Sequence, residues 1–244
     1  MQATTLFDGD YQWLVLGRDP DRNAKIIDTN QFLIRTERRA MVLEPGGVEI
    51  FPAMLMAVLH QVPVEQITDL FASHQDPDII SSLGLWDNAL PEARLHAPWM
   101  WEGFIRHFGC DHIEYLGIPD QGHAIELDGF QFQALPAHFL HSSGNFHLYD
   151  ASARILMSGD IGMALEPEQE KAPLFVEDLE QHFEYMRPLH QRWMPSNRAK
   201  NEWISRARDL DIEILAPQHG RLIKGADVGR FLDWLEELEV GITF

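Results

Sequence analysis

The chain has 244 residues, of which 45% are hydrophobic, so it is long enough to bury a sizeable core. Its 38 acidic and 19 basic residues give a formal net charge of −19. This balance argues against nucleic acid and anionic membranes as partners, because both reward clustered lysine and arginine. One cysteine excludes an internal disulfide, and the sequence shows no signal peptide and no apolar run of roughly 18–20 residues, so we expect a cytoplasmic protein.

Short strands and longer helices are predicted along the whole chain. The strands are expected at Tyr11–Gly17, Asn30–Ile34, Arg39–Leu43, Ile67–Ala72, Ile113–Leu116, Ala124–Leu127, Phe130–Leu135, Phe146–Tyr149, Ile155–Ser158 and Ile212–Leu215. Helical spacing predicts helices at Ile50–Val58, Pro77–Leu83, Trp99–Phe108, Glu177–Met194, Asn197–Leu210 and Ala226–Leu238. Strand clusters in each half, each followed by helices, predict an α/β fold of two packed sheets with helices outside. No linker or repeat interrupts the chain, so we expect one domain over residues 1–244.

Three potential metal ligands follow the predicted strand Ile67–Ala72. His74, Asp76 and Asp78 stand at alternate positions. Pro77 cannot donate to a strand ladder, so these side chains are expected in the loop that leaves the strand, where rigid scaffolds commonly hold their chemistry. Their spacing would let several side chains converge on a site that two metal ions share. On this stretch alone, a polar turn without metal remains the alternative.

Three later strand ends also carry side chains that can bind a metal. His138 and His141 follow one predicted strand, Asp160 follows the next, and His219 follows the last. Each has a structural alternative, because Asp160 after a glycine is typical of a turn and His219 before a glycine could cap its strand. For His138, support of a ligand and plain surface or core packing both stay open. Four such strand ends, in a chain with 12 histidines and one cysteine, together predict a metal centre with nitrogen and oxygen ligands.

The order of these motifs resembles the metallo-β-lactamase superfamily. The stretches that match are His74-Gln-Asp-Pro-Asp78, His141-Ser-Ser-Gly, Ser-Gly-Asp160 and Pro-Gln-His219-Gly. Asp76 and Ile79 stand where the zinc hydrolases of this superfamily carry two further histidines. A carboxylate at Asp76 is similar to the flavodiiron proteins, which carry a glutamate there, and so is the stretch Tyr185-Met-Arg-Pro188. The chain therefore resembles stand-alone oxygen-binding diiron proteins, which lack a flavodoxin domain.

The resemblance implies an αββα sandwich of the metallo-β-lactamase type and a dinuclear metal site. One metal would be held by His74, Asp76 and His141, the other by Asp78 and His219, and both would be bridged by Asp160. Three imidazoles and three carboxylates favour two iron ions, with zinc or manganese as alternatives. The second metal would have few protein ligands, and its open positions are expected to take O2, NO or azide.

These implications predict a non-haem diiron protein that binds O2. The 25 residues after His219 are too few for a flavin domain, so no FMN is expected. Either a separate electron-transfer protein drives reduction of O2 or NO, or the chain is a sensor that passes its state to a signalling partner. The resemblance also implies a homodimer. The alternative is a metal-dependent hydrolase that uses a metal-bound hydroxide, so whether the protein is an enzyme stays open.

Two further stretches have both a functional and a structural interpretation. Trp99, Met100 and Trp101 could wall the metal site, or they could pack in the core as the start of a helix. The acidic run Glu166–Glu170 is expected to be a solvated loop, with contact to a basic electron-transfer partner as the alternative.

Overall fold

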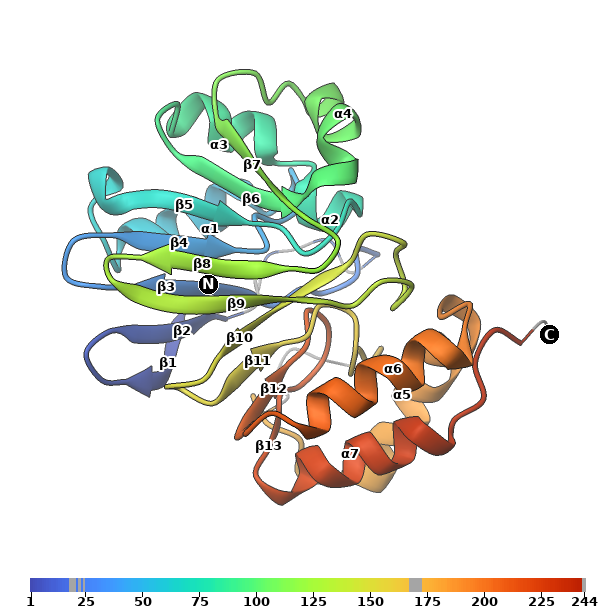
Figure 1. Ribbon diagram of the computed structural model, residues 1–244. Coiled ribbons are helices and arrows are strands. Elements are labelled where there is room, and N and C mark those ends of the chain that lie inside the picture. Colours follow the sequence, from blue (N-terminus) through green and yellow to red (C-terminus); the bar gives the residue numbers. More distant parts are fainter. Residues whose placement is uncertain (18–20, 22, 24, 167–172, 243–244) are drawn as a thin grey trace. The chain divides into compact units, whose positions relative to one another are not determined.

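The structure, a computed structural model, describes residues 1–17, 21, 23, 25–166 and 173–242. These residues form two β-sheets and a set of helices (Figure 1). They divide into two compact units, Met1–Phe132 and Gln133–Phe244, with the boundary inside strand β9 (Phe130–Pro136). The expectation of a single domain over the whole chain stays a prediction.

The first sheet belongs to the first unit and follows the chain in strand order β1-β2-β3-β4-β5-β6-β7. Its strands are β1 (Ala3–Asp8), β2 (Gln12–Leu16), β3 (Gln31–Arg35), β4 (Ala40–Leu43), β5 (Ile67–Phe71), β6 (Arg94–Pro98) and β7 (Glu114–Ile118). The strands from β1 to β4 pair antiparallel. Those from β4 to β7 pair parallel, so the carboxyl ends of β4, β5 and β6 point to the same edge of the sheet.

Helices bury one face of this first sheet. They are α1 (Phe51–Leu59), α2 (Pro77–Ile80), α3 (Leu83–Ala89) and α4 (Glu102–Ile105), with 3-10 turns at Val64–Gln66, Trp99–Trp101 and Arg106–Phe108. Leu14 and Leu16 of β2 share a core with Met54 and Val58 of α1. Trp13, which precedes Leu14 and so points to the other face of β2, is also buried. Both faces of β2 are therefore buried, which explains its continuous apolar sequence.

The second sheet has the strand order β13-β12-β11-β10-β9-β8. Besides β9 it contains β8 (His123–Leu127), β10 (Phe146–Asp150), β11 (Ile155–Met157), β12 (Ile214–Ala216) and β13 (Ile223–Lys224). Strands β11 and β12 pair parallel, whereas β9, β10 and β11 pair antiparallel in turn. The helices α5 (Leu179–Trp193), α6 (Asn197–Arg208) and α7 (Ala226–Glu237) lie together in the second unit (Figure 1). They share a core with β10, β11 and β12 that contains Leu156, Phe183 and Phe231.

The sequence predictions locate most of these elements and miss the strands β1, β6 and β13, the helix α3 and the 3-10 turn Val64–Gln66. Strand β1 is half exposed and mixes threonines with apolar residues, so it shows no clear alternation. Strand β6 contains Arg94 and His96, which are untypical of a buried strand. The single helix predicted at Trp99–Phe108 consists of a 3-10 turn, α4 and a second 3-10 turn.

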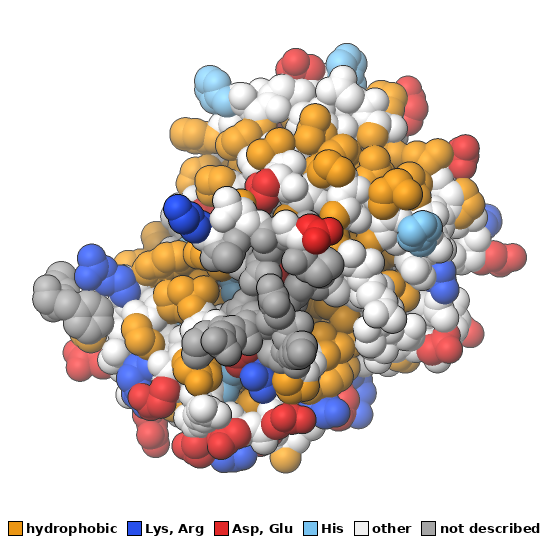
Figure 2. Space-filling view, turned by 180° about the vertical axis from the view of Figure 1, so that it is seen from behind, with side chains coloured by type: hydrophobic (Ala, Val, Ile, Leu, Met, Phe, Trp, Pro, Cys, Tyr) orange, Lys and Arg blue, Asp and Glu red, His pale blue; other side chains and the backbone are white. Residues whose placement is uncertain are grey.

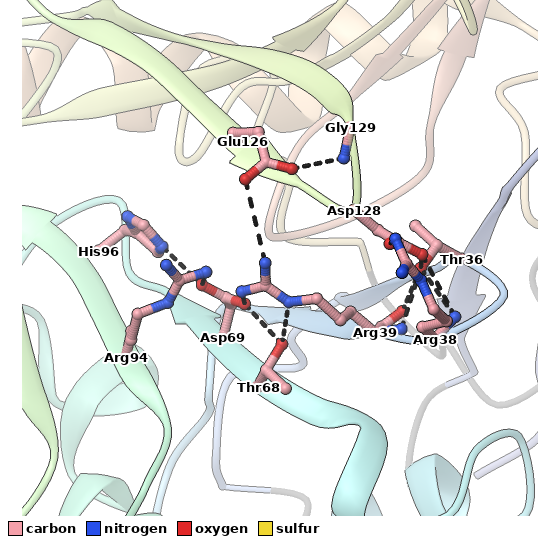
Figure 3. A network of polar contacts seen from close by, with 10 residues as sticks. All are labelled: Thr36, Arg38, Arg39, Thr68, Asp69, Arg94, His96, Glu126, Asp128 and Gly129. Atoms are coloured by element: carbon pink, nitrogen blue, oxygen red, sulfur yellow. Dashed lines mark hydrogen bonds and ion pairs between the residues drawn. The ribbon is translucent and has the colours of Figure 1, made fainter.

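The polar residues of β6 belong to a network around a buried carboxylate in the first unit (Figure 3). Asp69 of β5 is fully buried. Its Oδ2 atom lies 2.7 Å from Arg39 Nη2 and accepts a hydrogen bond from Thr68, while its Oδ1 atom lies 2.7 Å from Arg94 Nη2 and 2.8 Å from His96 Nε2. A buried charge is tolerated only when it is paired and hydrogen-bonded, so these partners explain why a charged strand folds inside the unit.

A second carboxylate of the same network anchors the turn between β8 and β9. Asp128 and Gly129 have φ angles of 54° and 90°, which is the geometry of the two-residue hairpin expected from an Asp-Gly pair. The Asp128 carboxylate accepts a 2.8 Å hydrogen bond from the Thr36 hydroxyl and forms an ion pair with Arg38 (Figure 3). The turn is therefore tied to the tip of the β3–β4 hairpin.

The surface of the first unit exposes several large hydrophobic side chains. Hydrophobic atoms gather in the upper part of Figure 2, the part of the molecule to which helices α1 to α4 belong in Figure 1. The exposed side chains of this unit include Val48, Met56, Leu59 and Leu85. Among the residues that the structure describes, no helix has the length and apolar character needed to cross a lipid bilayer.

We expect Asp69→Asn to lower the free energy of unfolding by about 3 kcal/mol, because it leaves two guanidinium groups without their buried counter-charge. Glu126→Gln is the matched control, since Glu126 also lies near Arg39 but at 4.0 Å and half exposed. The control should cost no more than about 1 kcal/mol. Urea unfolding followed by circular dichroism measures both, and equal losses would contradict the importance of the Asp69 network.

Candidate metal centre

The first set of predicted ligands follows β5 in the first unit. His74 is fully buried in the loop, Asp76 is the N-cap residue of α2, and Asp78 lies in the first turn of that helix. His74 Nε2 and Asp76 Oδ2 are 3.7 Å apart, so these two side chains face each other. Helix α2 begins at Pro77, as predicted, so Asp78 lies in its first turn rather than in the loop. Ile79 is fully buried in the core of the first unit.

The His74 ring is oriented by its neighbours in the loop. Ser73 Oγ lies 2.8 Å from His74 Nδ1, and this hydrogen bond directs the opposite ring nitrogen, Nε2, towards Asp76. The backbone N–H of Ser73 donates to Glu44 Oε1 at 3.2 Å, while the N–H of Glu44 donates to the Phe71 carbonyl at 2.9 Å. The loop after β4 thus supports the loop after β5. A hydrogen bond at the far nitrogen is the usual way in which proteins fix a metal-binding imidazole.

In the second unit, strand register places Asp160 beside His219. Strands β11 and β12 are parallel and pair Met157 with Ala216. Each candidate ligand lies three residues beyond its strand's last residue, so the two side chains reach the same level. The two loops are also joined by backbone hydrogen bonds, of which Gln218 N–H to Gly159 O is 2.7 Å long. As a result, His219 Nε2 lies 3.4 Å from Asp160 Oδ1.

His141 approaches the other oxygen of the same carboxylate. It lies in the loop between β9 and β10. The start of strand β10 pairs with the end of strand β11. His141 Nε2 is 3.1 Å from Asp160 Oδ2. The buried Asn145 side chain donates a hydrogen bond to the Leu140 carbonyl and so closes the loop around His141. On the outer side, the Trp193 ring stacks on the His141 ring with centroids 4.9 Å apart and an angle of 13°.

This arrangement in the second unit suits a pair of metal ions. Asp160 is buried, and each of its oxygens faces the Nε2 atom of a different histidine. A carboxylate that presents its two oxygens to two imidazoles in this way can bridge two metals, each of which also takes one nitrogen ligand. Imidazole and carboxylate donors fit iron, and they fit zinc or manganese as well.

His190 of α5 supports the loop that carries Asp160, which the sequence did not reveal. Its Nδ1–H donates to the Met186 carbonyl at 2.9 Å, and its Nε2 accepts a 3.0 Å hydrogen bond from the Gly162 N–H. Burial lowers the pKa of His190 to about 4, so the ring is neutral, as this hydrogen-bond pattern requires. Gly162 has a φ of +91°, and an added Cβ would lie 3.0 Å from Leu215.

Two further histidines of the second unit, His138 and His147, have structural neighbours. The His138 ring packs edge-on against Phe146 at 5.1 Å. His147 is fully buried and accepts a 3.0 Å hydrogen bond from the Trp203 indole. In the first unit, Trp101 packs against the hydrophobic core, whereas Trp99 is 55% exposed and donates to Asp120.

The acidic run is not solvated where the structure describes it, at Glu166. Its carboxylate is buried and pairs with His182 Nδ1 and Arg221 Nε, both at 3.0 Å. Burial alone would raise the pKa of Glu166, but the His182 hydrogen bond and the Arg221 charge outweigh it and hold the pKa below its usual value. The expectation of a solvated loop is therefore wrong for Glu166, because two partners distant in sequence bury it. The rest of the run, 167–170, lies outside the described residues.

Comparisons with known proteins identify one matching family and several similar solved structures. The model of a family described as ODP family beta lactamase matches residues 27–220. The chain is similar to the chemotaxis sensor ODP in its peroxy diiron species, with 35% identity, a TM-score of 0.86 and coverage of 99% of this chain and 97% of that chain. For the apo state of ODP from T. denticola, the identity is 36%, the TM-score 0.87 and the coverage 98% and 96%. A variant of the flavo di-iron protein from Thermotoga maritima is 18% identical, with a TM-score of 0.80, over 96% of this chain and 60% of that chain. A search of curated proteins gives no significant match.

Asn145→Ala is expected to weaken metal binding by about tenfold or more, because residues that hold a ligand loop in place affect affinity on this scale. Asn197→Ala is the matched control, since its amide also bonds main-chain atoms of the second unit, those of Val240. Anaerobic titration with ferrous iron measures the affinities, and thermal unfolding of both variants controls for stability. Equal loss of affinity in the two variants would show that Asn145 has no specific role.

Proposed function

The chain belongs to the family of ODP beta lactamases, and from this membership and its ligand arrangement we propose that it is a non-haem diiron protein that binds O2. The resemblance to metallo-β-lactamase-fold diiron proteins is confirmed. So is the α/β fold of metallo-β-lactamase type, since the two sheets and helices match the fold of ODP and of the flavodiiron core.

The observation that carries the proposal is the position of Asp160 between two histidines. Its oxygens lie 3.1 Å from His141 Nε2 and 3.4 Å from His219 Nε2, in a buried part of the second unit. A buried carboxylate that faces two imidazoles is stabilised best when cations lie between them, because a lone buried charge is costly. A bridging carboxylate with one nitrogen ligand on each side is the arrangement that a dinuclear centre needs.

We assign the full ligand set from the resemblance to the diiron family. One iron would be held by His74, Asp76 and His141 and the second by Asp78 and His219, and Asp160 would bridge the two. Asp76 is one methylene shorter than the glutamate of the flavodiiron loop. The buried Ile79 gives the second iron one ligand fewer than the zinc hydrolases have, which leaves positions open for a small ligand.

The charges of this ligand set suit iron and oxygen. Two divalent ions are nearly neutralised by three carboxylates, which a poorly solvated site tolerates. Two ferrous ions would supply the electrons that O2 needs in order to bind as an anion. The protein residues hold these ions in place: Ser73 orients His74, Asn145 closes the His141 loop, and His190 fixes the backbone after Asp160.

We favour a sensor over a reductase. The relatives that match almost the whole chain are named as a chemotaxis sensor, whereas the flavo di-iron protein is a longer chain of which this one covers 60%. A sensor retains its O2 ligand and passes the change to a signalling protein, and it needs no electron-transfer partner. We also propose a homodimer in the cytoplasm, in line with the apolar side chains exposed on the first unit. Light scattering tests the dimer, and a monomer mass would exclude it.

Ferrous loading without oxygen, followed by an air pulse, tests the proposed activity. We expect about two irons per chain and a visible charge-transfer band that appears with O2 and persists for minutes. A transient band with continued O2 consumption would indicate a reductase instead. Zinc as the only retained metal, no O2-dependent band and rapid hydrolysis of esters or phosphodiesters would contradict the proposal in favour of the hydrolase alternative.

His141→Ala is expected to remove about half of the bound iron and to abolish the O2-dependent band, because it deletes one nitrogen ligand next to Asp160. His138→Ala, three residues earlier in the same loop, is the control and should keep both, since its ring packs against Phe146. Iron analysis and visible spectra of the two variants provide the comparison. Equal effects of the two substitutions would mean that the wrong histidine has been assigned.

A further inference from the structure

Beside His141 and Asp160, the second unit contains a cavity of about 10 Å³, which is room for one molecule of the size of water. His141 and Asp160, which form part of its lining, are two of the proposed iron ligands. Its remaining walls come from the loop after β11 and from the C-terminal half of α5, and are formed by Ile161, Met163, Leu189, His190, Trp193 and Met194.

The cavity is a poor place for water. A buried water molecule needs two to four polar partners. The ring of His190 offers none, because its Nδ1–H is donated to Met186 and its Nε2 accepts from Gly162. At the polar edge, His141 Nε2 and Asp160 Oδ2 are directed at each other at 3.1 Å. The other walls are aliphatic, aromatic or thioether groups, so a small apolar molecule fits this space better than water does.

The outer wall of the cavity lies near the surface of the second unit. Trp193 is 41% exposed and stacks on the His141 ring, so it separates the ligand from solvent. Trp193 ends α5 and Met194 is its C-cap residue, where the helix gives way to extended backbone. The way in therefore lies beside one indole and one flexible methionine side chain rather than through the packed core.

We propose that this cavity is the place where O2 docks before it reaches the metal centre, and that Leu189 sets its size. This inference rests on the proposed function, and it adds to that function the residues past which O2 reaches the metal centre. O2 is a small apolar molecule that can occupy the cavity without hydrogen bonds. Charged ligands such as azide gain nothing there, because an ion in an apolar space loses its hydration.

Paramagnetic O2 provides a direct test that does not depend on iron. The protein is loaded with zinc, which has no redox chemistry, and its methyl NMR signals are compared under O2 and N2 pressure. We expect stronger O2-induced relaxation for the methyl groups of Ile161, Met163 and Met194 than for those of Leu235, which is equally buried in the same unit. Equal relaxation of all four residues would overturn the proposal.

Substitutions of Leu189 test the route in the iron-loaded protein. Leu189→Trp fills the cavity and is expected to slow O2 association by about tenfold while iron content stays unchanged. Leu189→Ala should accelerate it. Glu184→Trp places the same indole on the exposed side of α5 and serves as the control, with an unchanged rate. Stopped-flow absorption at several O2 concentrations gives the rate constants.

The outcomes separate this inference from the proposed function. If the wild-type protein shows no O2-dependent band but the zinc-loaded protein shows selective relaxation of the cavity methyl groups, the docking place stands and the diiron function fails. If the wild type binds O2 but Leu189→Trp and Glu184→Trp have equal association rates, O2 takes another way in, and this proposal is overturned while the diiron function stands.

Discussion

The candidate centre depends on the buried carboxylate of Asp160. An ionised carboxylate inside a protein is costly unless positive or hydrogen-bonding groups surround it. Here it faces the Nε2 atoms of His141 and His219. Its position follows from the parallel pairing of β11 and β12, which brings two strand ends to one edge of the sheet. Gly220, with a φ of +83°, lets the His219 loop approach the Asp160 loop so closely that an added Cβ would lie 3.0 Å from Ala164.

Three of the four candidate ligand loops are held by a residue outside the proposed ligand set. In the first unit, Ser73 fixes the ring of His74. In the second unit, Asn145 closes the His141 loop and His190 holds the backbone after Asp160. Such supporting residues set the orientation of the ligands before a metal arrives, so less ordering entropy is lost on binding. His190 also lines the cavity beside His141 and Asp160, so it connects the support of the centre to that cavity.

The candidate ligands at the strand ends could be recognised in the sequence because their types and positions are local features. A histidine or aspartate directly after an apolar strand can be recognised without tertiary information, and the motif order indicated the fold. The supporting residues were missed for the opposite reason. Asn145, His190 and Trp193 have no distinctive local pattern, and their roles depend on neighbours that the fold supplies. Glu166 was misjudged in the same way, since its partner Arg221 is 55 residues away.

Strand β6 of the first sheet, which was not predicted, shows the same limit of sequence-based prediction. Arg94 and His96 look unsuitable for a buried strand, and only the position of Asp69 on the neighbouring strand makes them acceptable there. Pattern-based predictions treat each segment separately, so they cannot recognise a charged residue whose counter-charge lies on another strand. The buried network in the first unit and the Asp160 cluster in the second follow one rule, because in both a buried carboxylate determines which residues its neighbours must be.

X-ray absorption spectroscopy at the iron edge tests the central claim, that Asp160 bridges two irons, most directly. We expect two irons per chain and an iron–iron scattering distance of about 3.5 Å in the anaerobically loaded protein. This signal should disappear in Asp160→Ala. Two bound irons without iron–iron scattering, or an unchanged signal in Asp160→Ala, would contradict this claim.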